Sequence, residues 1–116
     1  MRILILDDQP GLAEMLAVSL RVHGHFVKSF TSPREALASI GDMDILVVDY
    51  HMPEMNGLEV ARRAYDQGWR GSLLLMSGNP GAIKEAVEHP LLRLVLDKPF
   101  QTQTLANAVT NLGEHK

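Results

Sequence analysis

The sequence predicts an α/β fold, a doubly wound (βα)5 three-layer sandwich built on a parallel five-stranded sheet of order 2-1-3-4-5. Five short apolar runs of strand length alternate with segments that carry apolar residues at helical spacing. Three of the runs are nearly continuous rather than alternating in polarity, which is typical of strands buried on both faces of a parallel sheet. Right-handed crossovers between such strands place helices on both faces.

Four of the five predicted strands are rich in isoleucine, leucine and valine, and the second has phenylalanine at both ends. In chain order they are Arg2–Leu6, Phe26–Phe30, Asp44–Val48, Ser72–Met76 and Arg93–Leu96. The first, third and fourth are the nearly continuous ones, so we expect them to occupy the middle of the sheet and the other two to lie at its edges.

A helix is predicted after each strand. Ser32-Pro33 is a typical helix start, because serine caps the first turn, proline fits its first position, and Glu35 can close a capping box. Glycine follows the first and third helices, where it can end them. The other predicted helices cover 11–22, 57–67, 80–88 and 102–112.

Length and composition limit the kind of protein. The chain has 116 residues, a formal net charge of -3 and no cysteine. We expect one domain over 1–116, without a disulfide scaffold or a thiolate metal site. The acidic balance argues against nucleic-acid binding, and the apolar runs are too short to span a membrane, so a cytoplasmic compartment is favoured. Trp69 is expected to be partly buried at the edge of the core.

Polar residues stand at the carboxyl ends of four predicted strands. They are Asp7-Asp8, Asp49, Ser77 and Lys98. Carboxyl ends of parallel strands meet at one edge of the sheet, where ligands bind. Three carboxylates this close require a cation, and Mg²⁺ takes oxygen ligands.

Asp49 stands on the third strand, in the middle of this cluster, and is the natural nucleophile. A carboxylate can attack phosphorus to form an aspartyl phosphate. A divalent cation would shield the carboxylate from the repulsion of the phosphate. Ser77 would donate a hydrogen bond to a phosphoryl oxygen, and Lys98 would neutralise its charge.

The same motifs resemble the receiver domain of bacterial two-component response regulators. The resemblance covers the whole chain and includes, besides the residues above, Met52-Pro53, Asn56-Gly57, Ser77-Gly78 and Lys98-Pro99-Phe100. It implies a flavodoxin-like fold. It also implies that Asp49 is the phosphoacceptor, Ser77 the switch hydroxyl and Lys98 the phosphate-binding lysine, with a cis Lys98-Pro99 bond.

The resemblance further implies a metal and partners. Asp8, Asp49 and the backbone carbonyl of His51 would bind Mg²⁺ or Mn²⁺, and Asp7 would help through water. The phosphoryl donor would be a sensor histidine kinase or a phosphotransfer protein. The output would be a downstream protein target or a further output domain, and a homodimer is possible. No direct contact with nucleic acid or membrane is expected.

Two positions differ from the usual family pattern. Val95 stands three residues before the lysine, where the family usually has Phe or Tyr. Asp97 precedes Lys98 where the family tends to be apolar, and alternation along a strand should direct its side chain away from the site. His51 and Asn79 are two residues after the acceptor and the switch hydroxyl, and we expect them to influence the lifetime of the phosphoryl group.

Two other functions stay open at this point. One is a docking module whose acidic site is vestigial, and Val95 is the observation that favours it. The other is a phosphohydrolase that acts through an aspartyl phosphate, similar to haloacid-dehalogenase enzymes. Those enzymes need an acid two residues after the nucleophile, where this chain has His51. A receiver domain turns over no independent substrate, so we expect a protein that is not an enzyme.

Overall fold

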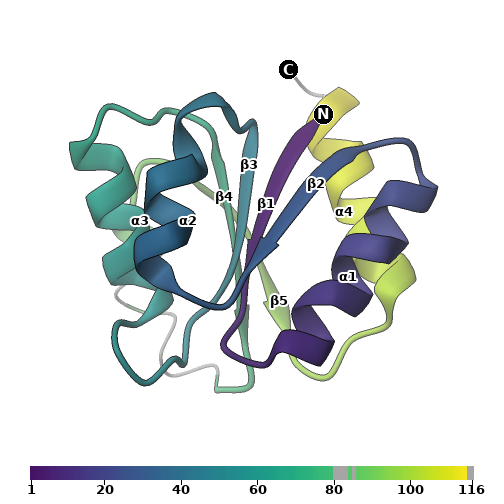
Figure 1. The fold of residues 1–116 in the computed structure, drawn as a ribbon, viewed down its shortest axis with the longest axis horizontal. Coiled ribbons are helices and arrows are strands. Elements are labelled where there is room, and N and C mark those ends of the chain that lie inside the picture. Colours follow the sequence, from purple (N-terminus) through teal and green to yellow (C-terminus); the bar gives the residue numbers. More distant parts are fainter. Residues whose placement is uncertain (80–83, 85, 115–116) are drawn as a thin grey trace.

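The computed structural model describes residues 1–79, 84 and 86–114, which form three layers (Figure 1). The middle layer is a five-stranded sheet of order β2-β1-β3-β4-β5 in which every pair is parallel. The predicted class and strand order are therefore confirmed. The strands are β1 (Arg2–Leu6), β2 (Phe26–Phe30), β3 (Ile45–Asp49), β4 (Ser72–Ser77) and β5 (Leu92–Asp97).

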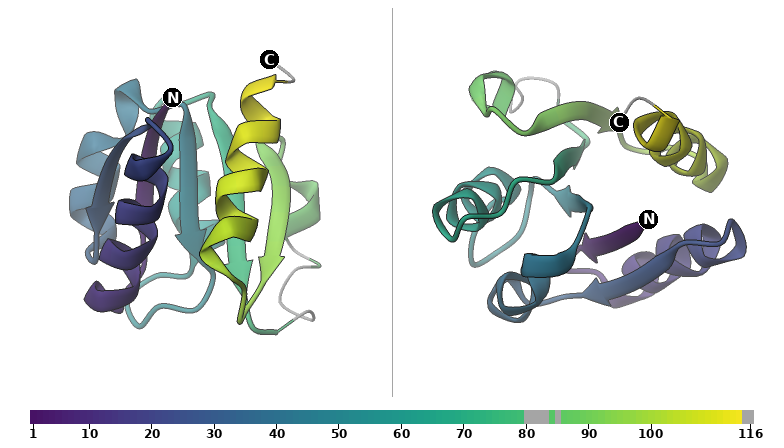
Figure 2. Two further views of the ribbon diagram at one scale, coloured as in Figure 1. Left: turned by 90° about the vertical axis from the view of Figure 1, so that its right-hand side faces the viewer. Right: turned by 90° about the horizontal axis from the view of Figure 1, so that it is seen from above.

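Two helices cover each face of the sheet. Helices α1 (Pro10–Val22) and α4 (Thr102–Glu114) pack on one face, and α2 (Pro33–Ser39) and α3 (Gly57–Asp66) pack on the other (Figures 1 and 2). Alternate residues of the central strands supply the two cores, because successive strand side chains point to opposite faces. This is why the inner residues of β1, β3 and β4 are all apolar, and polar residues occur only at the ends of these strands.

The two helix starts at Asn56 and Ser32 differ in how well they are capped. The third helix begins with a complete capping box, in which Asn56 Oδ1 accepts from the backbone N–H of Glu59 and Glu59 accepts from that of Asn56. At the second helix, the Glu35 N–H donates to Ser32 Oγ at 3.5 Å, so the predicted cap is weak. Short 3-10 helices occur at η1 (Ile40–Asp42) and η3 (Ala86–Glu88).

In the helix predicted over 80–88, residues 80–83 and 85 lie outside the described residues, residue 84 is in a turn, and 86–88 form η3. Among the helices of the described residues, none is both long enough and apolar enough to cross a membrane.

Trp69 is more deeply buried than predicted. Its side chain is 5% exposed, and its indole N–H donates to the carbonyl oxygen of Met43 at 2.8 Å. A Cβ on Gly71 would collide with the indole ring. The expectation of partial burial was wrong because a satisfied indole N–H allows the whole ring to enter the core.

His89 links the turn before β5 to helix α3. Its Nδ1 accepts a hydrogen bond from the Leu91 N–H at 3.1 Å, and its ring stands edge-on to Tyr65, 5.8 Å away. Burial lowers the pKa of His89, a hydrogen bond to the backbone of Ala61 opposes the shift, and the charge of Arg62 adds to it. The fold therefore favours the neutral imidazole.

We expect His89 to stabilise the fold at neutral pH and to lose this effect in acid. Its pKa is lower in the folded than in the unfolded state, so the contribution is present above about pH 6.5 and is lost as pH falls below that value. The free energy of unfolding of wild type should exceed that of His89→Gln at pH 7.5, and urea titrations should show the difference narrowing by pH 5.5. A constant difference would contradict this role. The exposed His23, replaced by Gln, is the control.

Candidate functional site

The site lies at the carboxyl edge of the sheet, the lower edge in Figure 1. Asp7 directly follows β1, Asp49 ends β3, Ser77 ends β4 and Lys98 directly follows β5. Because β1, β3 and β4 are neighbours, and β5 pairs with β4, four segments distant in the sequence meet at this edge. The predicted site residues are thus brought together.

Three carboxylates form one cluster at this edge. One oxygen each of Asp7, Asp8 and Asp49 lies within 4.8 Å of the others. Asp7 is fully buried, Asp49 is 6% exposed, and Asp8 is exposed to solvent. Oxygen ligands in this number, with one side open to water, suit a hard divalent cation such as Mg²⁺, which keeps several of its waters.

Lys98 lies between the two buried carboxylates. Its Nζ is 3.1 Å from Asp7 Oδ2 and 3.2 Å from Asp49 Oδ2. Burial alone would lower the pKa of Lys98, but the hydrogen bond and charge of Asp7, together with those of Asp49, outweigh it and raise the pKa. The lysine is therefore held as an ammonium.

Burial raises the pKa of Asp49. The charge of Lys98 opposes this shift, and the charge of Asp7 adds to it. One ammonium is thus too little to balance the carboxylates at this edge. The excess negative charge is an electrostatic reason for a cation to bind here.

Backbone N–H groups orient the carboxylates. The Gln9 N–H donates to Asp7 Oδ1 at 3.0 Å, and the His51 N–H donates to Asp49 Oδ1 at 3.3 Å. In each carboxylate, the second oxygen, Oδ2, faces the ammonium of Lys98. The backbone segment after each strand therefore fixes the rotamer of the functional side chain.

The first residue of α3 touches the backbone of Asp49. A Cβ on Gly57 would stand 2.6 Å from the Asp49 carbonyl oxygen, which is closer than real contacts allow. The Gly57 N–H also donates to the carbonyl oxygen of Tyr50 at 2.9 Å. The sequence indicated Asn56-Gly57 only as a helix start and part of a motif, so this contact was missed.

Ser77 is buried, and in this structure its hydroxyl is bonded to the next turn. Ser77 Oγ accepts from the Asn79 N–H and donates to the Asn79 carbonyl, both at 3.0 Å. The Lys98 N–H donates to the Ser77 carbonyl at 2.9 Å, which keeps the two residues side by side. The Lys98-Pro99 bond is cis, as predicted.

The remaining singled-out residues lie at or near the rim. His51 is exposed, with its ring edge-on to Tyr50 at 5.0 Å between centroids. Asp97 is exposed, as strand alternation predicted. Val95 is partly buried and packs against the core on the α2 and α3 side of the sheet. Asn79, two residues after Ser77, is exposed.

The family model of the response regulator receiver domain matches residues 3–110. The chain belongs to this family. The transcriptional regulatory protein FixJ of Rhizobium meliloti (strain 1021) is 30% identical over 115 residues, which are 96% of this chain and 56% of that protein. The response regulator protein TmoT of Ectopseudomonas mendocina is 32% identical over 112 residues, 92% of this chain and 50% of TmoT. This receiver domain therefore spans about half the length of these two relatives.

Another relative and two solved structures are matched over nearly their whole length. The response regulator receiver protein CpdR of Brucella abortus (strain 2308) is 28% identical over 96% of this chain and 95% of CpdR. Vibrio cholerae CheY4 has a TM-score of 0.84 at 25% identity, and the match covers 96% of this receiver domain and 97% of CheY4. Thermotoga maritima TrrA, solved in complex with Mg²⁺ and BeF, has a TM-score of 0.81 at 26% identity and the same coverage.

We expect Asp49→Asn to raise the thermal stability of the receiver domain in metal-free buffer at neutral pH. The pKa of Asp49 is raised on folding, so its ionised form opposes folding once pH exceeds the value of an unfolded aspartate, about 3.9. Asparagine keeps the shape and removes the charge. Melting followed by circular dichroism should show a rise of a few degrees, and Mg²⁺ should stabilise wild type more than the variant.

Asp97→Asn is the matched control for that comparison. Asp97 ends β5 at the same edge of the sheet as Asp49, but its side chain is exposed, so the substitution removes a carboxylate from outside the cluster. Its melting temperature should match wild type with and without Mg²⁺. If Asp49→Asn and Asp97→Asn had the same melting temperatures, with and without Mg²⁺, the cluster would carry no excess negative charge.

Proposed function

We propose that this receiver domain accepts a phosphoryl group on Asp49 and that the new charge shifts its conformation and partner binding. The observation that carries the proposal is the position of the Asp49 carboxylate. It is nearly buried in the centre of the acidic edge, with one oxygen 3.2 Å from the Lys98 ammonium. The donor would be a phosphohistidine of a sensor histidine kinase or phosphotransfer protein.

In the transfer, an oxygen of Asp49 forms a bond to phosphorus while the phosphorus–nitrogen bond of the donor breaks. The bonding electrons stay on the donor's imidazole nitrogen. Asp8, Asp49 and the His51 carbonyl would hold a divalent cation, with Asp7 acting through water. That cation, when bound, neutralises charge on the phosphoryl oxygens and on the attacking carboxylate. The raised pKa of Lys98 keeps a second positive charge at the same place.

Ser77 would carry the change to the surrounding chain. Its hydroxyl can donate to a phosphoryl oxygen only after it leaves the Asn79 carbonyl, to which it donates here. A movement of Ser77 Oγ toward the phosphoryl group would also break the hydrogen bond that it accepts from the Asn79 N–H. With Val95 in place of an aromatic residue, we assign the conformational response mainly to the backbone after Ser77.

Such a domain acts in signalling and turns over no independent substrate. The output would be a contact with another protein or with a further domain of a longer chain. TmoT and FixJ are both about twice as long as the matched segment. A cytoplasmic location agrees with a role as the acceptor for a kinase.

The decisive measurement is intact mass after incubation with Mg²⁺ and acetyl phosphate. We expect a gain of one phosphoryl group, and no gain in Asp49→Asn or when Mg²⁺ is removed by chelation. Asp97→Asn should be phosphorylated like wild type, because its carboxylate is exposed and lies outside the cluster. No gain in wild type would favour a docking module with a vestigial site. A gain that persists in Asp49→Asn would identify a different acceptor.

We expect His51 to promote hydrolysis of the phosphoryl group by taking a proton from the attacking water. The side chain is exposed beside the acceptor, where water and phosphate would meet. The phosphorylated His51→Ala variant should lose its phosphate severalfold more slowly than wild type, and the pH profile of its hydrolysis should differ from that of wild type. His23→Ala, which removes an exposed histidine elsewhere, serves as control. An unchanged rate and pH profile in His51→Ala would exclude this role.

A further inference from the structure

A groove of about 370 Å³ lies between α2 and α3, on the surface of the molecule. Its floor is apolar, because Leu37 of α2 and Met55 of the loop before α3 line it and pack against the core beneath. Both side chains are only partly buried, so the groove keeps apolar surface in contact with water. Apolar surface bordered by polar residues is typical of a contact site for another protein.

Two arginines border the groove, one on each helix. Arg34 belongs to α2 and Arg63 to α3, and both side chains are exposed. Among the described residues, neither guanidinium has a hydrogen-bond or ion-pair partner. Glu59 stands one turn before Arg63, where an ion pair would be usual, but its carboxylate accepts from the Asn56 N–H instead. Both arginines are therefore available to carboxylates from outside.

The charge of the groove is opposite in sign to that of the chain as a whole. Its lining has two arginines and one acidic residue, Glu54, whereas the chain has a formal net charge of -3. The cluster of Asp7, Asp8 and Asp49 lies at the carboxyl edge of the sheet and repels an acidic partner, while the groove attracts one. Complementary charge of this kind decides where and in which orientation a partner binds.

We propose that this groove binds an acidic amphipathic helix of a partner protein. The apolar side chains of that helix would cover Leu37 and Met55, and its carboxylates would pair with Arg34 and Arg63. A helix fits better than an extended segment, because the groove lies between two helices, whose backbone groups are bonded internally, and offers no strand edge. Arginine forms two parallel hydrogen bonds with a carboxylate, so acidic residues on both flanks of an apolar stripe match the two borders.

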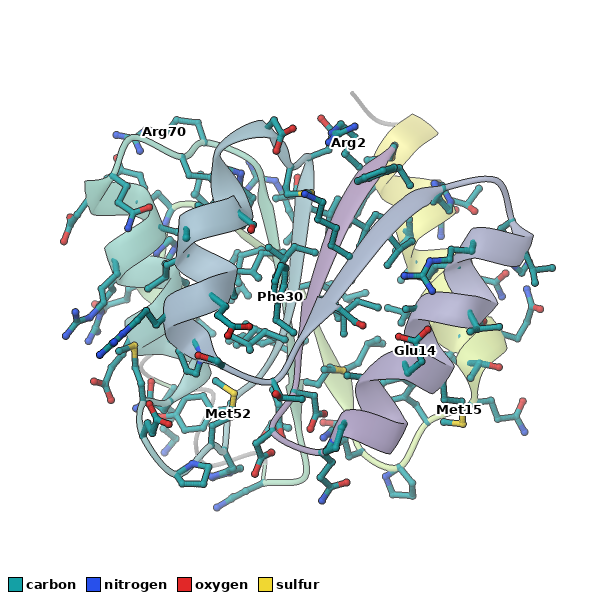
Figure 3. The ribbon with its side chains drawn as sticks, in the orientation of Figure 1. Arg2, Glu14, Met15, Phe30, Met52 and Arg70 are labelled. Atoms are coloured by element: carbon teal, nitrogen blue, oxygen red, sulfur yellow. The ribbon has the colours of Figure 1, made fainter. Side chains whose placement is uncertain are left out.

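The groove adjoins the loop that connects β3 to α3. Its lining includes Glu54 and Met55 of this loop, which spans residues 50–56. Met52, in the same loop, packs against the core on this face and lies near the lower end of α2 in Figure 3. The loop begins directly after Asp49, so a helix bound in the groove would contact the segment that follows the functional carboxylate.

This inference does not depend on phosphorylation of Asp49, and peptide binding tests it directly. The probe is a dye-labelled helical peptide of about 18 residues, in which glutamates flank a stripe of leucines on both sides. The buffer is free of Mg²⁺ and contains about 0.15 M salt, which screens contacts between distant charges. Fluorescence anisotropy should give a dissociation constant below about 1 mM. No binding to wild type up to that concentration would overturn the proposal.

Charge reversal at the borders of the groove should weaken this binding. Arg63→Glu and Arg34→Glu should each raise the dissociation constant by about tenfold or more, because each places like charges together. Arg62→Glu is the matched control, since Arg62 is the adjacent, also exposed residue of α3 but lines a different cavity, beside His89. It should bind the peptide like wild type. Equal weakening by Arg62→Glu and Arg63→Glu would overturn the proposal, and far-UV circular dichroism checks that the variants are folded.

The absence of cysteine allows a test of the position of the peptide. Ala38 is exposed and lines the groove, so an environment-sensitive dye on Ala38→Cys should change its emission when the peptide covers it. The same dye on Asn111→Cys, at an exposed position of α4 on the opposite face of the sheet, should not respond. Equal responses at the two positions would show binding without preference for the groove and would overturn the proposal.

Discussion

One ammonium shared by two buried carboxylates is the interaction on which the functional edge of this domain depends. Lys98 bonds to Asp7 and to Asp49, so it joins the ends of β1 and β3 to the end of β5. With Asp8 close by, negative charge stays in excess. Burial and the charge of Asp7 raise the pKa of Asp49, as expected where negative charge is in excess, and such an imbalance favours the binding of a cation.

Much of this arrangement could be predicted from the sequence, because it follows from local patterns. Nearly continuous apolar runs identified β1, β3 and β4 as central strands, and the polar residue after each run identified the functional edge. In a parallel sheet, the ends of the strands necessarily gather at one side. The prediction therefore needed no knowledge of any distance between Asp7, Asp49 and Lys98.

The features that the sequence did not predict depend on contacts between distant segments. The burial of Trp69 rests on the carbonyl of Met43, 26 residues away in the chain. The need for glycine at position 57 arises from the Asp49 carbonyl, which lies in another element. The bonds of Ser77 to Asn79 are local, but they depend on a turn whose shape composition does not specify. Sequence patterns identify which groups meet, and packing decides how closely.

Gly57 gives strand β3 and helix α3 a common boundary. Nothing larger than hydrogen fits between the Gly57 backbone and the carbonyl of Asp49, and the next carbonyl, that of Tyr50, is bonded to the Gly57 N–H. The strand end and the helix start therefore behave as two parts in direct mechanical contact, without a compressible side chain between them. A shift of the backbone at Asp49 would therefore act directly on the start of α3, on the face of the sheet opposite to α1.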